Sequence, residues 1–306
     1  MNRKILLDCD PGHDDAIAIL LAGQKQYFNL LGITTVSGNQ TIEKTTQNAI
    51  NLVEFLKIDV PVAMGSSDPI ARERRICPEI HGESGLDGFE FPKYSKKCDS
   101  RNAIDFIIDT LLSNDKVTVV ITGPMTNVAK AIKKNKTILN HIDEIIFMGG
   151  STTDGNVTPA AEFNILVDPE AADIVLSSGV PIKMVGLNIT RTVLVTKQVI
   201  ERMRKINNQT SKLFVDLMEV FNANQAKFFG IMEGGPLHDP ITIASMIDNQ
   251  LITWEKMNVK VDTSHSALEG KTYCEELEPH NCEVAVAIDI NRFWDIVEQG
   301  IRYYRR

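Results

Sequence analysis

Four aspartates stand within eight residues near the start of the chain, between two apolar segments. Residues 4–7 are typical of a short buried strand, and from His13 onward Ala, Ile and Leu recur as they do in a packed helix. In an open α/β sheet the junction between such a strand and helix lies at the carboxyl edge, where ligands bind. This turn carries Asp8, Asp10, Asp14 and Asp15.

Part of this acidity has an ordinary structural explanation. Acidic residues in the first turn of a helix interact favourably with the helix dipole, by roughly 0.3–1 kcal/mol each. That covers Asp14 and Asp15, and Asp10 before Pro-Gly could belong to a turn. It still leaves Asp8 and Asp10 beside two further carboxylates, whose repulsion should raise their pKa values or require a cation. We therefore expect a metal site or an acid–base site.

Short strands rich in β-branched residues alternate with helical segments along most of the chain. This alternation predicts an α/β fold with a mostly parallel central sheet, helices on both faces and the site at the carboxyl ends of the strands. Two later strands, near 258–261 and 283–287, are expected as additions at the edge. Without an internal repeat or linker, we expect one domain over residues 1–306. The main predicted strands are 4–7, 30–36, 60–64, 117–121, 144–148 and 180–185.

Composition narrows the class of protein. Lys and Arg total 32 against 40 Asp and Glu, a formal charge of −8, so nucleic acid is an unfavourable partner. No stretch approaches the roughly 18 apolar residues of a membrane span, and the N-terminus lacks a signal-peptide pattern. We expect a cytoplasmic protein with no membrane partner. The five cysteines show no C-x-x-C spacing, so we expect reduced thiols.

Residues 65–100 interrupt the alternation of strands and helices. Long irregular segments in compact domains are often lids or binding loops. Glycines at 82, 85 and 88 would allow a mobile flap, and His81 is the residue on it that could do chemistry. An exposed loop histidine without a function is the alternative.

Polar side chains follow several of the predicted strands and should meet at one edge of the sheet. Glu162 and Asn164, two residues apart on an expected extended segment, should face the same side. Oxygen ligands of this kind suit calcium or magnesium better than zinc. Carboxylates and amides without Lys or Arg suit a neutral polyhydroxyl ligand. The converging set is Asp10, Asp14, Asp15, Asn39, Thr122, Asn156, Glu162, Asn164, His238 and Asp239.

The segment Asp8-Cys9-Asp10-Pro11-Gly12-His13-Asp14-Asp15 resembles the N-terminal fingerprint of the calcium-dependent nucleoside hydrolases of the inosine-uridine preferring type. The resemblance spans nearly the whole chain, because residues 122–124, 161–172 and 237–240 are similar to family segments in family order. The loop 80–88 is most similar to that of the bacterial pyrimidine-preferring ribonucleoside hydrolases.

This resemblance implies hydrolysis of the N-glycosidic bond of ribonucleosides to free base and ribose. Pyrimidine nucleosides such as uridine and cytidine would be favoured, as in pyrimidine salvage, and the enzyme would be a homotetramer. A Ca²⁺ ion would also bind a water and the ribose 2′- and 3′-hydroxyls, and Asp10 would take the proton of that water. The implied metal ligands are Asp10, Asp15, the carbonyl of Thr122, and Asp239.

The resemblance also assigns the rest of the site. Asp8 would not bind the ligand itself but would help to hold the other acids in position. His238 and His81 would donate a proton or hydrogen bond to the leaving base, although His238 could instead be a packing residue at a helix start. The implied sugar contacts are Asp14, Asn39, Met148, Asn156, Glu162 and Asn164.

The segment that should contact the base departs from the family pattern. Gln225 matches, but Phe229 stands where the pyrimidine-preferring relatives carry tyrosine, and the loop before Gly234 is one residue longer. Asn188 replaces a usual aspartate, which we interpret as a structural variation. Base contacts are therefore assigned to Gln225, Phe229, His81 and His238, and a broad purine and pyrimidine specificity is the alternative.

Two other classes of protein share part of the pattern. Asp8-x-Asp10 after a strand imitates the nucleophile pair of haloacid-dehalogenase-type phosphatases, but Pro11-Gly12 replaces the expected Asp-Gly-Thr continuation. A non-enzymatic calcium-binding or sugar-binding module is the other alternative.

Overall fold

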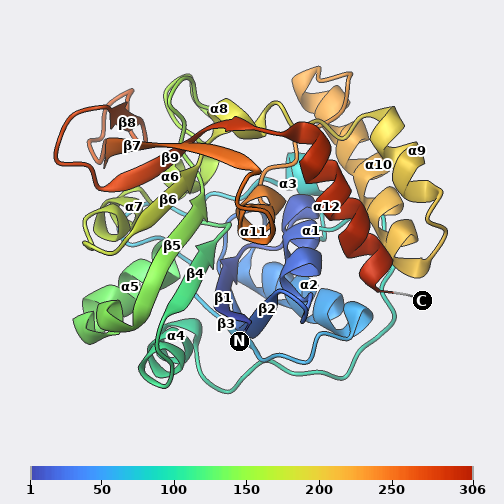
Figure 1. Cartoon of the computed structure of the whole chain (residues 1–306), viewed down its shortest axis with the longest axis horizontal. Helices are drawn as coiled ribbons and strands as arrows, with labels where there is room; N and C mark the ends of the chain where they lie inside the picture. The colour runs from blue at the N-terminus through green and yellow to red at the C-terminus, as the bar shows by residue number, and fades with distance from the viewer. Residues whose placement is uncertain (1, 305–306) are drawn as a thin grey trace.

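A computed structural model describes residues 2–304, which form one α/β domain around a nine-stranded sheet (Figure 1). The strands are β1 (Arg3–Cys9), β2 (Phe28–Thr35), β3 (Val62–Met64), β4 (Val117–Ile121), β5 (Ile142–Met148), β6 (Ile182–Val185), β7 (Ile252–Val261), β8 (Thr272–Glu275) and β9 (Cys282–Ile288). Their order is β3-β2-β1-β4-β5-β6-β9-β7-β8. β1 to β6 and β9 run parallel, whereas β7 is antiparallel to both of its neighbours. The predicted fold class is confirmed.

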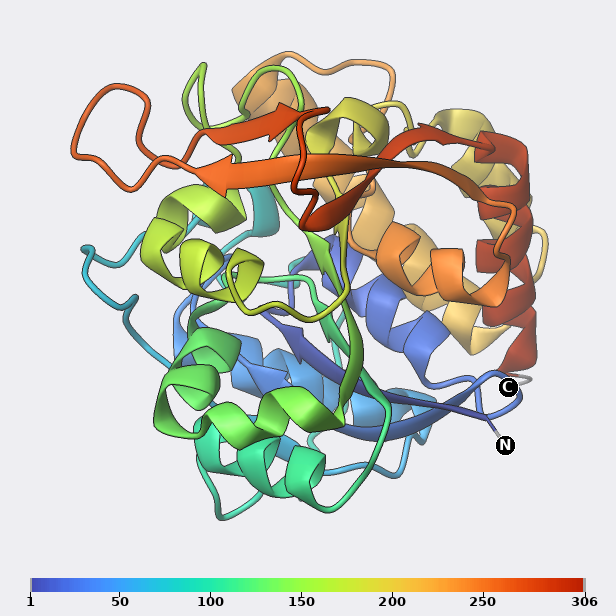
Figure 2. The same cartoon turned by 60° about the vertical axis from the view of Figure 1, so that its left-hand side comes forward.

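Helices cover both faces of the sheet, as Figures 1 and 2 show. One face packs against α1 (His13–Ala22), α2 (Ile42–Leu56), α9 (Lys197–Arg204), α10 (Gln209–Phe229), α11 (Pro240–Ile247) and α12 (Ile290–Tyr303). The other packs against α4 (Ala103–Leu112), α5 (Thr126–Lys134), the 3₁₀ helix η1 (Lys136–His141), α6 (Phe163–Val167) and α7 (Pro169–Leu176). Two further short helices are α3 (Pro78–His81) and α8 (Leu187–Thr190).

The first strand and helix lie at the centre of this arrangement. Ile5 and Leu7 of β1 point into one core and Leu6 into the other, following the two-residue period of a strand. α1 is buried on every side, because α2, α11 and α12 pack around it. Its N-terminal acids are consequently buried together with its apolar residues.

The late part of the sheet differs from the sequence prediction. β9 is not an edge strand: it pairs in parallel with β6 and antiparallel with β7. Its buried residues Val284 and Ala285 are adjacent in sequence, as expected for a strand covered on both faces. β7 begins earlier than predicted, at Ile252. The short strand β8 was not predicted, because it contains too few apolar residues to be recognised from the sequence.

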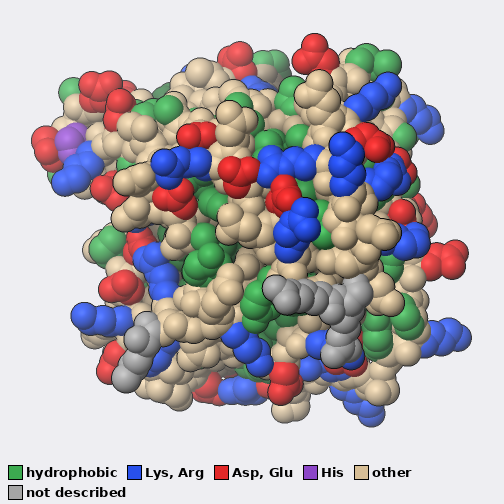
Figure 3. Space-filling model, turned by 45° about the vertical axis from the view of Figure 1, so that its right-hand side comes forward, with side chains coloured by type: hydrophobic (Ala, Val, Ile, Leu, Met, Phe, Trp, Pro, Cys, Tyr) green, Lys and Arg blue, Asp and Glu red, His purple; other side chains and the backbone are tan. Residues whose placement is uncertain are grey.

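Asp168 is the N-cap of α7, because its Oδ1 accepts a hydrogen bond from the main-chain nitrogen of Ala171. All five cysteines are free thiols. Within residues 2–304, no helix combines the length and the apolar character that crossing a membrane requires. On the face drawn in Figure 3, acidic and basic side chains are interspersed.

Candidate active site

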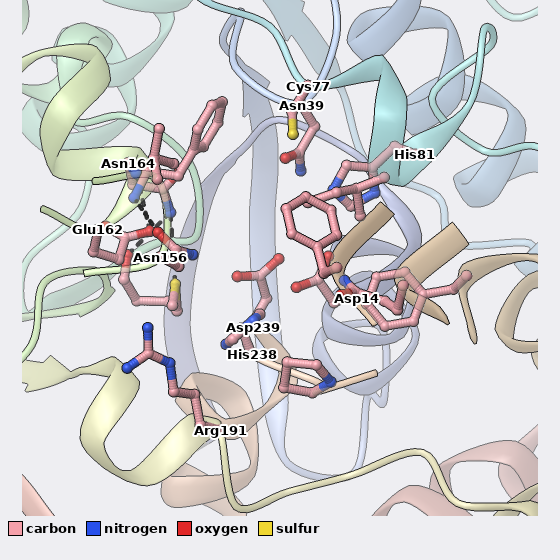
Figure 4. Close-up of a pocket in the computed structure, with 18 of the residues that line it drawn as sticks. Asp14, Asn39, Cys77, His81, Asn156, Glu162, Asn164, Arg191, His238 and Asp239 are labelled. Atoms are coloured by element: carbon pink, nitrogen blue, oxygen red, sulfur yellow. Dashed lines mark hydrogen bonds between the residues drawn. The ribbon is translucent and has the colours of Figure 1, made fainter. Parts of the chain in front are cut away.

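All predicted site residues except Asp8, Asp10 and Asp15 line one cavity of about 570 Å³. It opens where β1, β2, β4 and β5 end, so the polar side chains meet at the carboxyl edge of the sheet, as predicted. Figure 4 shows Glu162, Asn164 and Asn156 on one side of the cavity and His81 on the other, with Asp14 and Asp239 between them. The predicted residues in its wall are Asp14, Asn39, His81, Thr122, Met148, Asn156, Glu162, Asn164, Gln225, Phe229, His238 and Asp239.

Three buried carboxylates form a tight cluster, two of them in the floor of the cavity and Asp15 directly behind them. One oxygen from each of Asp14, Asp15 and Asp239 lies within 4.8 Å of the others. Burial is the largest cause that raises the pKa of each group, to about 7 for Asp14, and neighbouring carboxylates raise the pKa values of Asp14 and Asp239 further. Oδ1 of Asp14 is buried without a hydrogen-bond partner. Crowded acids with an unpartnered oxygen fit a bound cation, which would neutralise their repulsion.

Asp10 and Asp15 lie directly behind this floor. Asp15 Oδ1 accepts a hydrogen bond from Thr122 Oγ1 at 2.7 Å, and Oδ2 accepts bonds from Gly12 N and Asn39 Nδ2, both at 3.0 Å. Asp10 Oδ2 accepts a bond from Asn39 N at 2.7 Å. Burial, followed by the charge of Asp15, raises the pKa of Asp10 well above its ordinary value.

Two glycines make room for the Asp10 carboxylate. A Cβ atom at Gly38 would lie 2.1 Å from Asp10 Oδ2, and one at Gly123 would lie 2.7 Å from Asp10 Oδ1. Any larger side chain at either position would displace the carboxylate. Both turns are therefore shaped around Asp10.

Asp8 lies outside the cavity and is fixed by two hydrogen bonds. Its Oδ1 accepts hydrogen bonds from Thr34 Oγ1 at 2.5 Å and from Asn127 Nδ2 at 2.8 Å, which join β1 to β2 and α5. Burial raises its pKa to about 7. Asp8 does not line the cavity.

The segment with Glu162 and Asn164 is not extended, so that part of the prediction is wrong. Glu162 is the N-cap of α6: Oε1 accepts a bond from Asn164 N, and Oε2 accepts bonds from Gly150 N and Ile165 N. Asn164 lies in the first turn, and its Nδ2 donates to the Thr122 carbonyl at 2.9 Å. Both side chains still face the cavity, because the cap turns the chain there.

The two histidines of the prediction line the opposite part of the cavity. His81 is only 5% exposed, at the end of α3, so the alternative of an exposed loop histidine is wrong. His238 Nδ1 lies 2.7 Å from Thr190 Oγ1. Burial and then the charge of Arg191 lower the pKa of His238 to about 4. Burial also lowers the pKa of His81 well below its ordinary value, so both rings are neutral at physiological pH.

Gln225 and Phe229 extend from α10 toward the same space. Gln225 is buried, whereas Phe229 is 49% exposed at the end of the helix. In the loop that follows, Ile231 lines the cavity, whereas Met232 is 79% exposed and does not line it.

Several cavity residues carried no usable signal in the sequence. Arg191 lines the wall and donates to the carbonyls of Asp154 and Gly155, which anchors the loop before Asn156. Cys77 lies in the irregular segment before α3, where no pattern marks it. Phe221 belongs to the ordinary apolar pattern of α10. His13, which lies inside the acidic motif but does not line the cavity, was given no role from the sequence.

A buried acidic cluster at the carboxyl edge of a parallel sheet, facing histidines across a cavity, is typical of metal-assisted hydrolases of the α/β class. Comparison with known proteins gives the family. Residues 5–295 match the model of the inosine-uridine preferring nucleoside hydrolases, and the chain belongs to this family. The expected resemblance is confirmed, and the chain is a nucleoside hydrolase rather than a phosphatase or a non-enzymatic binding module.

Individual relatives cover essentially the whole chain. The pyrimidine-specific ribonucleoside hydrolase RihB of Escherichia coli (strain K12) is 44% identical over 99% of this chain and 98% of its own length. A purine-preferring ribonucleoside hydrolase from Gardnerella vaginalis is 33% identical, with a TM-score of 0.91 and 98% of each chain covered. A plant nucleoside hydrolase, PpNRh1, is 30% identical, with a TM-score of 0.92 and coverage of 98% of this chain and 99% of its own.

Proposed function

We propose that the protein hydrolyses pyrimidine ribonucleosides such as uridine and cytidine to free base and ribose. The observation that carries this proposal is the cavity itself, with buried acids in its floor, amides and Glu162 on one side and His81 on the other. The 44% identity to a pyrimidine-specific enzyme supports the choice of base. Nucleosides are the substrate class of the family.

The acidic floor fits a calcium ion, because its donors are oxygens and Asp14 Oδ1 has no other partner. By family resemblance the ligands would be Asp10, Asp15, the Thr122 carbonyl and Asp239. Asp14 would then face the sugar, although its oxygen lies as close to Asp15 and Asp239 as a ligand would. When bound, the ion would orient a water and the ribose diol and lower the pKa of the water.

Individual side chains would carry out the other steps of the reaction. Asp10, fixed by Asn39 and by the two glycine turns, would accept the proton of the attacking water. As the glycosidic bond breaks, positive charge develops on the ribose, and the carboxylates of Asp14 and Glu162 would stabilise it more than the neutral ground state. Asn39, Met148, Asn156 and Asn164 would hold the sugar.

The leaving base takes the electron pair of the broken bond and needs a hydrogen bond or a proton. His81 and His238 would supply it, and Gln225 would contact the polar edge of the base. Phe229 cannot donate as tyrosine would. By the same resemblance, we expect a homotetramer that acts in the cytoplasm on free nucleosides.

A panel of nucleosides tests this proposal. We expect ribose release from uridine and cytidine to exceed that from inosine and adenosine, and a chelator to abolish it until Ca²⁺ is restored. The measurement is reducing sugar released per unit time at matched substrate concentrations. Activity that persists after exhaustive chelation would contradict the metal assignment, and faster cleavage of inosine would contradict the base preference.

A broad purine and pyrimidine specificity is the second candidate. Phe229 in place of tyrosine and the apolar side chain of Ile231 in the cavity wall favour it, because both reduce the polar contacts that would select a pyrimidine. Comparable rates of ribose release from the purine and pyrimidine nucleosides would establish this broad specificity.

Activity should depend on pH through Glu162. Burial raises the pKa of Glu162 to about 7, and four main-chain N–H groups only partly oppose this shift. The ionised form is the one that stabilises the sugar cation, so kcat/KM for uridine should fall about tenfold per pH unit below the pKa. A bound cation would lower the pKa of Asp14 and of the proposed ligands Asp10, Asp15 and Asp239, which leaves Glu162 as the titrating acid in the cavity wall.

Profiles of the wild type and of Glu162→Gln, taken with saturating Ca²⁺, check this expectation. The variant should be slow and should lack the acidic limb. A wild-type profile that stays flat down to about pH 5 would contradict the role of Glu162.

A further inference from the structure

Thr190 and His238 are in contact at the edge of the cavity. Thr190, the last residue of α8, is fully buried and does not line the cavity, whereas His238 does. The two side chains meet through Thr190 Oγ1 and His238 Nδ1, which lie 2.7 Å apart. His238 stands beside Asp239 in the cavity (Figure 4). Thr190 therefore contacts, from outside the cavity, a histidine that we assign to the leaving base.

Main-chain pairing holds these two residues opposite each other. Residues 193–195, just after α8, run beside residues 235–237, just before His238, and two main-chain hydrogen bonds of 2.9 Å join the two segments. Neither bond involves the side chain of Thr190. Both should persist when that side chain is changed, so a substitution at Thr190 acts mainly on its contact with the imidazole.

The direction of the hydrogen bond follows from the other partners of the two side chains. Within residues 2–304, Thr190 Oγ1 has no partner except His238 Nδ1. If the ring were the donor, the buried hydroxyl proton would have no acceptor, which is costly. The hydroxyl therefore donates and Nδ1 accepts. A neutral ring then carries its proton on Nε2, which makes no hydrogen bond in the part of the chain that the structure describes and is left for the substrate.

We propose that Thr190 is a positioning residue for leaving-base activation: its hydroxyl fixes the ring of His238 so that the Nε2–H donates a hydrogen bond to the departing base. This inference rests on the proposed function. When the bond between C1′ and the base nitrogen breaks, its electron pair remains on the base, C1′ gains the oxygen of the attacking water, and Asp10 takes the proton of that water. His238 keeps its own proton, and the base takes one from the solvent after it leaves. Thr190 does not touch the substrate.

The Thr190 hydroxyl affects the histidine in two ways. It anchors the ring, so the Nε2–H stays aimed at one point in the cavity. It also polarises the ring, because hydrogen bonds in a chain strengthen one another. The bond from Nε2 strengthens as negative charge grows on the base, so its benefit appears in the transition state more than in the bound substrate. The loss of the hydroxyl should therefore lower kcat rather than raise KM.

Three variants test the proposal. Thr190→Val keeps the shape of the side chain but cannot donate, Thr190→Ser keeps the hydroxyl, and Thr192→Val, whose hydroxyl bonds to the carbonyl of Ile189 instead, is the control. On uridine at saturating Ca²⁺, we expect kcat to fall about five- to tenfold in Thr190→Val, roughly what one hydrogen bond contributes, with little change in KM. Thr190→Ser should recover most of the loss, and the control should match the wild type.

A substrate that needs no help with its leaving group separates positioning from structural damage. The aglycone of 4-nitrophenyl β-D-ribofuranoside leaves as a stable phenolate, so Thr190→Val should lose much less activity on it than on uridine. Equal losses on the two substrates would overturn the proposal, as would a loss in Thr190→Ser as large as that in Thr190→Val.

The ¹⁵N spectrum of the wild type tests the same contact without any loss of activity. The signals of His238, identified by their absence in His238→Gln, should show an unprotonated Nδ1 and a protonated Nε2, and the opposite tautomer would overturn the proposal. If the wild type cleaves no uridine, the proposed function itself fails, whereas wild-type rates in Thr190→Val refute only this inference.

Discussion

Asp10→Asn is expected to lower kcat on uridine by about 10²–10⁴-fold, the range that a positioned general base contributes. Asparagine keeps the shape that Gly38 and Gly123 accommodate and can still accept the Asn39 N–H bond. It cannot take a proton from water, and it removes one charge from the proposed metal site. Steady-state kinetics at saturating Ca²⁺ measure the effect.

Asp8→Asn is the matched control, two residues earlier in the chain, near the end of β1. Its Oδ1 can keep the bonds from Thr34 and Asn127, and its amide would occupy the position of the unpartnered Oδ2. We expect activity within about threefold of the wild type, since the change lies outside the cavity. Wild-type turnover in Asp10→Asn would remove Asp10 as the base.

The second large effect concerns the sugar. We expect 2′-deoxyuridine to be cleaved about 10⁴-fold more slowly than uridine, because a site built to bond a substrate hydroxyl discriminates by roughly that factor against an analogue lacking it. The diol is the part of the substrate that we expect to face the acidic floor. Its loss would also leave buried oxygens there without their partner.

Comparing kcat/KM for the two nucleosides at one Ca²⁺ concentration measures this difference. 5′-Deoxyuridine is the control, because it keeps the diol and lacks only the hydroxyl at the other end of the ribose. It should lose far less activity than 2′-deoxyuridine. Equal rates for uridine and 2′-deoxyuridine would refute binding of the diol at the acidic floor.

The parts of the fold that local patterns encode could be predicted. The strands before residue 190 have dense runs of β-branched residues, and the break between α9 and α10 falls at Asn207, whose left-handed backbone (φ 56°) asparagine tolerates. The interior position of β9 could not be predicted. It depends on pairing with β6, about a hundred residues earlier, rather than on any local feature.

The same distinction applies to the site: some of its residues are recognisable from the local sequence, and others only from the folded chain. Asp10, Asp14 and Asp15 were recognisable because their spacing is itself unusual. The partnership of His13 and His81 spans 68 residues and depends on how one loop packs over another. Arg191 was missed for a different reason: an arginine after a short helix is ordinary, and only the folded loop at Gly155 gives it a function.

The interior position of β9 has a consequence for synthesis. β9 is the last strand to leave the ribosome, yet it joins β6 to the β7–β8 hairpin. Until it emerges, β6 keeps an open hydrogen-bonding edge and the hairpin has nothing to attach to. Such an edge is a template for aggregation, so a nascent chain stalled before Cys282 would depend on chaperones although most of its catalytic residues are already in place.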